Sequence, residues 1–168
     1  SIWEAIQYCG AERLGHGVRI TDDISVDGVE YGELDEPARA ALPARVRAGE
    51  ADVRLGRLAA FVRDRRIALE VCPGSNVALG VYSALAEVPL RRLLDAGAVV
   101  ALGADDPLLF GSRLLDQYET ARAIGFTDEE LAHLAASSIR LSSAPEEVRT
   151  RLLDGVQGWL RTPPEPAG

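Results

Sequence analysis

A short apolar run followed by two carboxylates, at residues 99–107, constrains the fold of this chain more than any other stretch. Its sequence is Val-Val-Ala-Leu-Gly-Ala-Asp-Asp-Pro. Four successive apolar residues have the length and composition of a strand that is buried on both faces. Pro107 ends the strand, so Asp105 and Asp106 stand at its carboxyl end, where α/β folds place their chemistry. Because two adjacent carboxylates are unfavourable in a dry pocket, they require a metal, a cation or a polar ligand.

The same Asp-Asp-Pro triplet is also a good helix start. Asp105 or Asp106 can serve as the N-cap, with Pro107 at the first helical position. From these residues alone, a capping role and a role in a functional site both stay open.

Length, charge and cysteine content bound the class of protein. The chain has 168 residues, enough for one domain, and a net charge of −8 that argues against nucleic acid or an anionic membrane as a partner. No apolar run approaches a membrane span. The two cysteines, Cys9 and Cys72, show no metal-type spacing, so reduced thiols in a cytoplasmic protein are expected, with one disulfide as the alternative.

Strands and helices alternate along the chain. Helical patterns cover residues 1–9, 55–65, 85–96 and 114–124, and further helices follow Thr127 and Pro145; strands are predicted at 11–17, 67–72 and 98–102, with a polar loop at 73–76. Alternation of this kind predicts a parallel sheet with right-handed crossovers, an α/β fold.

Two segments do not fit this alternation. Residues 21–52 are acidic and poor in aromatic side chains, with a turn signal at Asp27-Gly28 and one helical turn at 39–42, and we expect a surface insertion there. Residues 162–168 carry three prolines and are predicted to form a disordered tail.

All three predicted strands end in polar groups. His16 lies between two glycines, which let a ligand or the backbone approach closely; the alternative is a turn with an incidental histidine. The segment 73–76 follows the second strand, and Asp105 with Asp106 follows the third. Functional groups at the same edge of successive strands suit an α/β barrel, although three strands cannot close one and a full barrel needs about 250 residues.

Together these motifs resemble those of the adenosine deaminase family. They are Leu-Gly-His-Gly at 14–17, Leu-Glu-Val-Cys-Pro-Gly-Ser-Asn at 69–76 and Gly-Ala-Asp-Asp-Pro at 103–107, followed by segments 125–131 and 144–147 in the same order. The resemblance implies that residues 1–161 form the C-terminal part of one (β/α)8 barrel domain, with strands six to eight and the helices that follow.

The resemblance also implies roles for particular residues. It makes Asp105 a zinc ligand that also hydrogen-bonds the attacking water, and His16 a residue that orients and activates the metal-bound hydroxide. It places Asp106 on a purine ring nitrogen and Gly15 among the substrate-binding residues. One zinc ion per site would generate a nucleophile near neutral pH.

The implied reaction is hydrolytic deamination of adenosine or 2′-deoxyadenosine to inosine or 2′-deoxyinosine, with release of ammonia. Two alternatives stay open: another 6-aminopurine substrate, such as adenine or aminodeoxyfutalosine, or a catalytically dead homologue with a binding role.

The chain also departs from the family pattern. An early His-x-His pair, a later His and a general-acid Glu are missing, and the other histidine, His133, falls on a predicted helix surface. Because one carboxylate and one histidine cannot build a four-coordinate zinc site, we expect this chain to be inactive alone. Its expected partners are a purine nucleoside and the remaining N-terminal barrel segment, and a homo-oligomer is compatible with the sequence.

Overall fold

The centre of the molecule is a parallel sheet of three short strands. The computed structural model describes residues 1–162, and the sheet has the order β1-β5-β6. Its strands are β1 (Arg13–Gly15), β5 (Ala68–Val71) and β6 (Val100–Leu102). All three fall within predicted strand segments and pair in parallel, which confirms the expected α/β arrangement.

The two faces of this sheet have different surroundings. In the register of the strands, Leu14 lies beside Leu69, and Leu69 beside Val100. All three are buried in the hydrophobic core. The next row, in which Glu70 lies between Gly15 and Ala101, points to the opposite face because strand side chains alternate. This second face carries polar groups.

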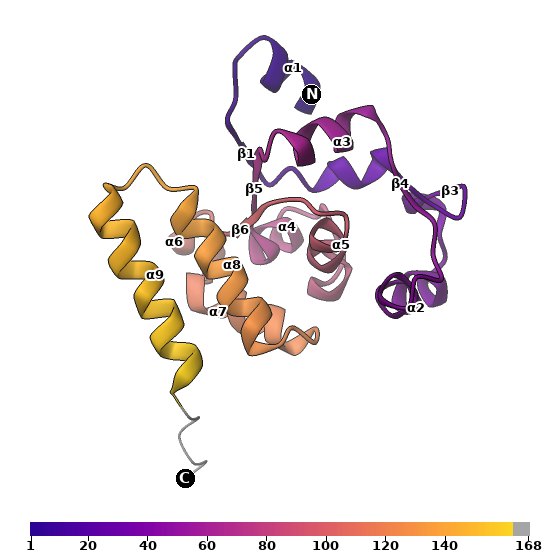
Figure 1. Cartoon of the computed structure of the whole chain (residues 1–168). Coiled ribbons are helices and arrows are strands. Elements are labelled where there is room, and N and C mark those ends of the chain that lie inside the picture. Colours follow the sequence, from indigo (N-terminus) through magenta and orange to yellow (C-terminus); the bar gives the residue numbers. More distant parts are fainter. Residues whose placement is uncertain (163–168) are drawn as a thin grey trace.

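Nine α-helices and three 3₁₀ helices within residues 1–162 surround the two sheets (Figure 1). The α-helices are α1 (Ile2–Gln7), α2 (Glu36–Arg47), α3 (Arg57–Asp64), α4 (Pro73–Ala78), α5 (Leu90–Asp95), α6 (Pro107–Phe110), α7 (Leu114–Ala123), α8 (Asp128–Arg140) and α9 (Glu146–Arg161). The 3₁₀ helices are η1 (Val18–Asp23), η2 (Tyr31–Glu33) and η3 (Leu85–Glu87). No helix in this part of the chain is long and apolar enough to cross a bilayer.

The acidic segment 21–52 contributes to the core as well as to the surface. A second sheet, of order β3-β2-β4, is built from β2 (Ile24–Val26), β3 (Val29–Glu30) and β4 (Val53–Leu55). Its hairpin turns at Asp27-Gly28, where the φ angles are 52° and 83°, so this turn signal is confirmed. The strands were not predicted, and of α2 only the helical turn at 39–42 was. This segment buries four apolar side chains in the core, namely Ile24, Val26, Tyr31 and Leu42.

A partly buried cation joins this segment to the rest of the molecule. The guanidinium of Arg92, on α5, lies 3.4 Å from the centre of the Tyr31 ring, in η2. Burial lowers the pKa of Arg92 to about 10. The stacked pair therefore packs α5 against η2.

Two local expectations are wrong, and proline explains both. The predicted loop at 73–76 is the first turn of α4. Pro73 suits the first helical position, and the backbone N–H of Asn76 donates to the Cys72 carbonyl. The predicted single helix at 85–96 is divided into η3 and α5, since Pro89 has no N–H to donate to a continuous helix.

Other local expectations are confirmed. The helices expected within residues 1–9 and after Thr127 are present as α1 and α8, and each of them starts with a capping box. Cys9 and Cys72 are both free thiols, so the disulfide alternative is excluded for this pair. The expected disordered tail, apart from Thr162, lies outside the described residues.

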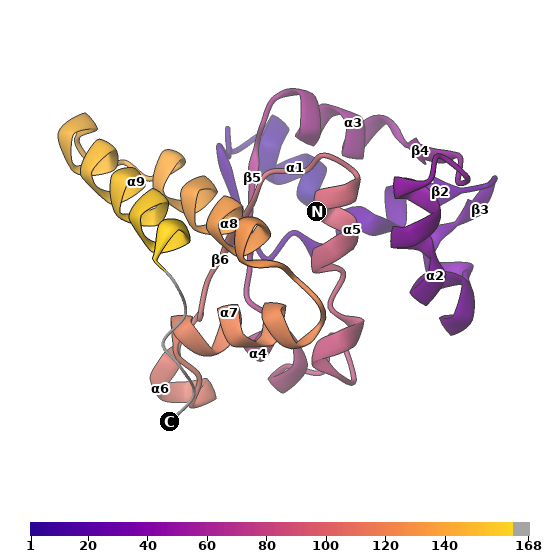
Figure 2. The same ribbon diagram turned by 60° about the horizontal axis from the view of Figure 1, so that its bottom comes forward.

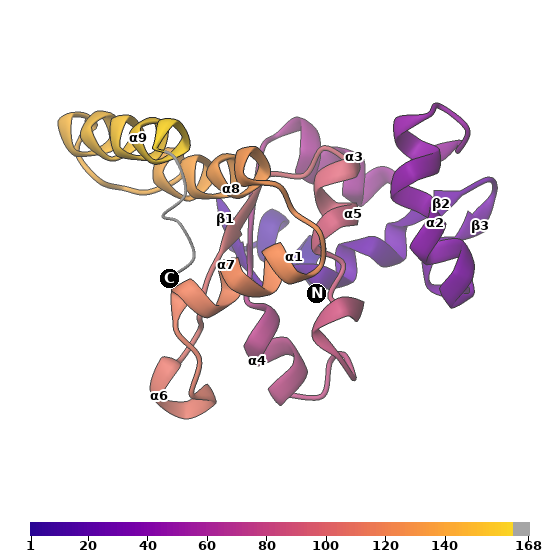
Figure 3. The ribbon, with the colours of Figure 1, turned by 90° about the horizontal axis from the view of Figure 1, so that it is seen from below.

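The second sheet with α2 and the last helix, α9, lie at opposite ends of the molecule, with the parallel sheet between them (Figure 2). Figure 3 shows α4, α6 and α7 gathered on one side of the parallel strands. These helices follow β5 and β6 along the chain, so they surround the carboxyl ends of the strands.

Candidate active site

His16 stands directly after β1, where the backbone ladder continues for one more residue. Its amide donates to the Glu70 carbonyl at 2.8 Å, and its φ is 57°, in the left-handed region. Gly17 follows with φ 66°, and a Cβ at this position would lie 2.6 Å from the Cδ2 atom of Leu69. The second flanking glycine is therefore required by both backbone conformation and packing.

Asp105 occupies the equivalent place after β6. The Gly103 amide donates to the Val71 carbonyl at 3.0 Å, which extends the ladder beyond the strand. A Cβ on Gly103 would lie 3.0 Å from the Cys72 sulfur, so the small residue lets the two strand ends approach. Asp105 itself has a φ of 58°. Backbone strain of this kind in a residue other than glycine is concentrated at functional sites.

The structure brings these two predicted site residues together. The Nε2 atom of His16 lies 3.4 Å from Oδ2 of Asp105, and the side chains are 35% and 34% exposed. They border a pocket of about 380 Å³ on the polar face of the parallel sheet. Gly15, the third predicted residue, lines the same pocket.

Asp106 caps a helix. Its Oδ1 atom accepts from the amides of Leu108 and Leu109, both at 3.0 Å, at the start of α6. The capping alternative is therefore confirmed for Asp106. The cap occupies Oδ1 and does not test the predicted role of this carboxylate in substrate binding.

Three further residues border the site and were not singled out from the sequence. Glu70 and Cys72 line the 380 Å³ pocket, and Arg13 donates to Glu70 from its Nε atom at 2.7 Å. Burial, and secondly the charge of Asp105, raise the pKa of the Cys72 thiol to about 11. The thiol is therefore neutral beside the carboxylate. Strand alternation from Glu70 to Cys72 could have predicted their shared face.

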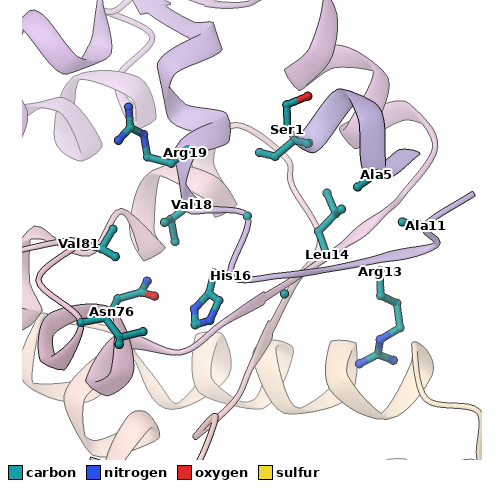
Figure 4. Close-up of a pocket in the computed structure, with 14 residues that line it drawn as sticks. Ser1, Ala5, Ala11, Arg13, Leu14, His16, Val18, Arg19, Asn76 and Val81 are labelled. Carbon is teal, nitrogen blue, oxygen red and sulfur yellow. The ribbon is translucent and has the colours of Figure 1, made fainter. Parts of the chain in front are cut away.

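Asn76 is a fourth residue that the sequence pattern does not single out, because residues 73–76 are predicted to form a loop. It is 1% exposed in α4 and lines a second pocket, of about 500 Å³, together with His16 (Figure 4). This second pocket lies between α1, the end of β1 and α4.

The donor atoms present fit part of a metal site. A carboxylate oxygen and an imidazole nitrogen are both ligand types that zinc accepts. Residues 1–162 contain no group of three or more His, Cys, Asp or Glu side chains placed to hold a metal ion. Within the described chain, the 3.4 Å pair of His16 and Asp105 is thus too small a set of donors to hold zinc without further ligands.

Parallel strands with polar side chains at their carboxyl ends are typical of α/β-barrel proteins. Comparison with known proteins defines the family. The family model described as Adenosine deaminase matches residues 1–159. The chain belongs to the adenosine deaminase family.

Individual relatives agree with this assignment. The chain is 54% identical, over 83% of its length, to a Streptomyces coelicolor protein provisionally named adenosine/adenine deaminase. It is 36% identical, over 93% of its length, to an adenosine deaminase of Mycobacterium tuberculosis. The crystal structure of an adenine deaminase from Arthrobacter aurescens matches 96% of the chain with a TM-score of 0.72 and 29% identity.

The match covers only part of each of these proteins. The chain spans 36% of the Streptomyces protein, 37% of the Mycobacterium protein and 40% of the Arthrobacter structure. The fold is accordingly part of a deaminase barrel, as the resemblance of the sequence motifs implied.

Proposed function

We propose that this chain supplies the carboxyl-terminal part of the active site of a zinc-dependent deaminase of 6-aminopurines. The observation that carries the proposal is the 3.4 Å approach of His16 Nε2 to Asp105 Oδ2 at the ends of two parallel strands. The family membership of residues 1–159 supports it.

The residues of this chain would have separate roles in the reaction. Asp105 would bind zinc with a carboxylate oxygen and direct the attacking water. His16 would orient the same water through Nε2, because its ring already faces Asp105. Zinc, when bound, would lower the pKa of water so that hydroxide forms near neutral pH.

Asp106 and Gly15 would contact the purine. The Oδ1 atom of Asp106 is held by two amides of α6, so its second oxygen would face the base from a fixed position. Gly15 would leave room for the ring, since a Cβ added to this glycine would have no neighbour within 4 Å in the described chain.

The other zinc ligands and the general acid would come from an N-terminal barrel segment. Within residues 1–162, β1 and β6 are the edges of the parallel sheet, each paired on one side only. Exposed edges of this kind are unfavourable, and a barrel removes them by pairing with further strands. We propose that such a segment covers these edges and the polar face, and that the enzyme acts in the cytoplasm with both thiols reduced.

The substrate is proposed to be adenosine or 2′-deoxyadenosine. Adenine is the second candidate, because the Arthrobacter neighbour, an adenine deaminase, matches nearly the whole chain. The test is ammonia release by the full-length protein from adenosine, 2′-deoxyadenosine, adenine and aminodeoxyfutalosine. Turnover of adenine alone would exclude the nucleoside assignment, and no turnover of any of these compounds would contradict the proposed activity.

A further inference from the structure

Two buried nitrogen atoms beside the site have no hydrogen-bond partner within residues 1–162. They are Nδ1 of His16 and Nδ2 of Asn76. Both residues line the 500 Å³ pocket, and Figure 4 shows the carboxamide of Asn76 directed toward the imidazole ring. Because buried polar atoms are nearly always bonded, each of these two requires an explanation.

The chemistry of the two atoms is complementary. Nε2 of His16 faces a carboxylate oxygen of Asp105, which can only accept, so in the neutral ring Nε2 carries the hydrogen. Nδ1 is then an acceptor and lacks a donor. The amide nitrogen of Asn76 carries two N–H donors and lacks an acceptor.

The other polar side chains around this pocket each take part in a hydrogen bond. Arg13 donates to Glu70, Arg19 donates to Asp22 at 2.7 Å, and the hydroxyl of Ser1 accepts from the Glu4 backbone N–H. Asn76 differs from them because its side chain is almost fully buried and its donor atom, Nδ2, has no partner within residues 1–162.

The local structure of α4 does not require the side-chain amide of Asn76. The backbone of Asn76 holds the local structure, since its N–H donates to the Cys72 carbonyl at 3.0 Å and its carbonyl accepts from Val81 at 2.9 Å. Neither bond uses the side chain, although the side chain is almost fully buried.

We propose that Asn76 is a positioning residue for His16. Its Nδ2–H donates to Nδ1 of His16, directly or through one bridging water, and so holds the imidazole with Nε2–H toward Asp105. The inference rests on the proposed function for its catalytic consequence. The arrangement of the ring hydrogen can be measured without any assay of activity.

The experiment uses the full-length protein labelled with ¹⁵N-histidine. The resonances of His16 are identified by their absence in His16→Gln. The wild-type protein is expected to show a hydrogen on Nε2 and a hydrogen-bonded acceptor at Nδ1. Asn76→Leu, which keeps the volume and removes the donor, should lose this pattern and give a mixture of ring tautomers.

Activity provides a second readout. In Asn76→Leu, kcat should fall about tenfold or more, as is typical when a group that orients a site residue is removed, while KM changes much less. Asn76→Ser retains an O–H donor and should recover part of both kcat and the wild-type spectrum. Ser75→Ala is the matched control, since Ser75 is equally buried but its hydroxyl donates to the Cys72 carbonyl; it should leave the His16 spectrum unchanged.

A hydrogen on Nδ1 in the wild-type spectrum would overturn the proposal and requires no variant to fold. An Asn76→Leu protein with the wild-type spectrum and wild-type kcat would overturn it as well. If the wild-type protein releases no ammonia from any purine, the proposed function fails, while the spectra still decide the role of Asn76.

Discussion

Replacement of Gly17 by alanine should destabilise the protein and displace the site at the same time. Gly17 has a φ of 66°, and a Cβ added there would lie 2.6 Å from Cδ2 of Leu69. Leu69 is fully buried in the middle strand of the parallel sheet, so it has little room to move.

The size of the effect follows from two costs. A non-glycine residue in the left-handed conformation costs about 1–2 kcal/mol. An extra methyl group pressed into a close-packed core costs about 1–3 kcal/mol more. The sum, roughly 2–5 kcal/mol, is a large share of the 5–15 kcal/mol that is typical of folded proteins.

Gly10→Ala is the matched control for the backbone cost. Gly10 has a φ of 63°, and a Cβ there would have no neighbour within 4 Å in the described chain. Urea unfolding of the full-length proteins should therefore show Gly17→Ala to be less stable than Gly10→Ala by about 1–3 kcal/mol, the contact term alone.

A double substitution separates the contact from other causes. Leu69→Ala alone should cost about 2–5 kcal/mol because it leaves a cavity. The double variant Gly17→Ala/Leu69→Ala should be destabilised by less than the sum of the two single costs, because the removed side chain is the one that the new methyl group would contact. Equal destabilisation by Gly17→Ala and Gly10→Ala, together with additive costs in the double variant, would refute this reasoning.

Three further predictions concern the site itself. Asp105→Ala in the full-length protein should lose zinc and deaminase activity together, measured by metal analysis and ammonia release; full zinc occupancy would contradict its role as a ligand. Asp106→Ala should lower stability by about 1 kcal/mol through loss of the α6 cap, whereas Asp106→Asn should retain the cap and lose only kcat/KM for the purine; unfolding and kinetics on the pair separate the two roles. Because its pKa is raised to about 11, the Cys72 thiol is about one part in a thousand thiolate at pH 8. Alkylation at pH 8 followed by mass spectrometry should therefore find Cys72 unmodified while exposed Cys9 reacts, and the alkylation rate of Cys72 should rise about tenfold per pH unit up to its pKa. Rapid reaction of Cys72 at pH 8 would disprove its burial.

Strong local signals predicted the fold where the chain forms the parallel sheet. The run at residues 99–102 is apolar and the segment 67–72 is apolar except for Glu70, so both were recognisable as buried strands. The second sheet was missed because β2 and β3 have only three and two residues, too short for a reliable alternation. Most acidic side chains of segment 21–52 belong to its exposed face, and their abundance hides the pattern of the four apolar residues that this segment buries.

The sequence predicted the site residues at the ends of the strands but not the buried residues beside them. His16 and Asp105 follow strands directly, so topology alone brings them to one edge. Asn76 was hidden because its role depends on α4, a helix that a sequence with proline, glycine, serine and asparagine in succession does not suggest. The burial of Cys72 likewise depends on the closeness of β5 to β6, which only the three-dimensional register gives.

The backbone conformations of His16 and Asp105 support the functional roles proposed for their side chains. Eight glycines within residues 1–162 have positive φ, but only four other residues do. Two of the four have local explanations: Asp27 is held by Arg45 and the Asp52 amide, and Arg66 directly follows the end of α3, where left-handed residues are common. At the other two positions, glycine would relieve roughly 1–3 kcal/mol of strain each. Backbone conformation therefore favours glycine at both strand ends, and the 3.4 Å contact between the two side chains is the interaction that glycine at either position would remove.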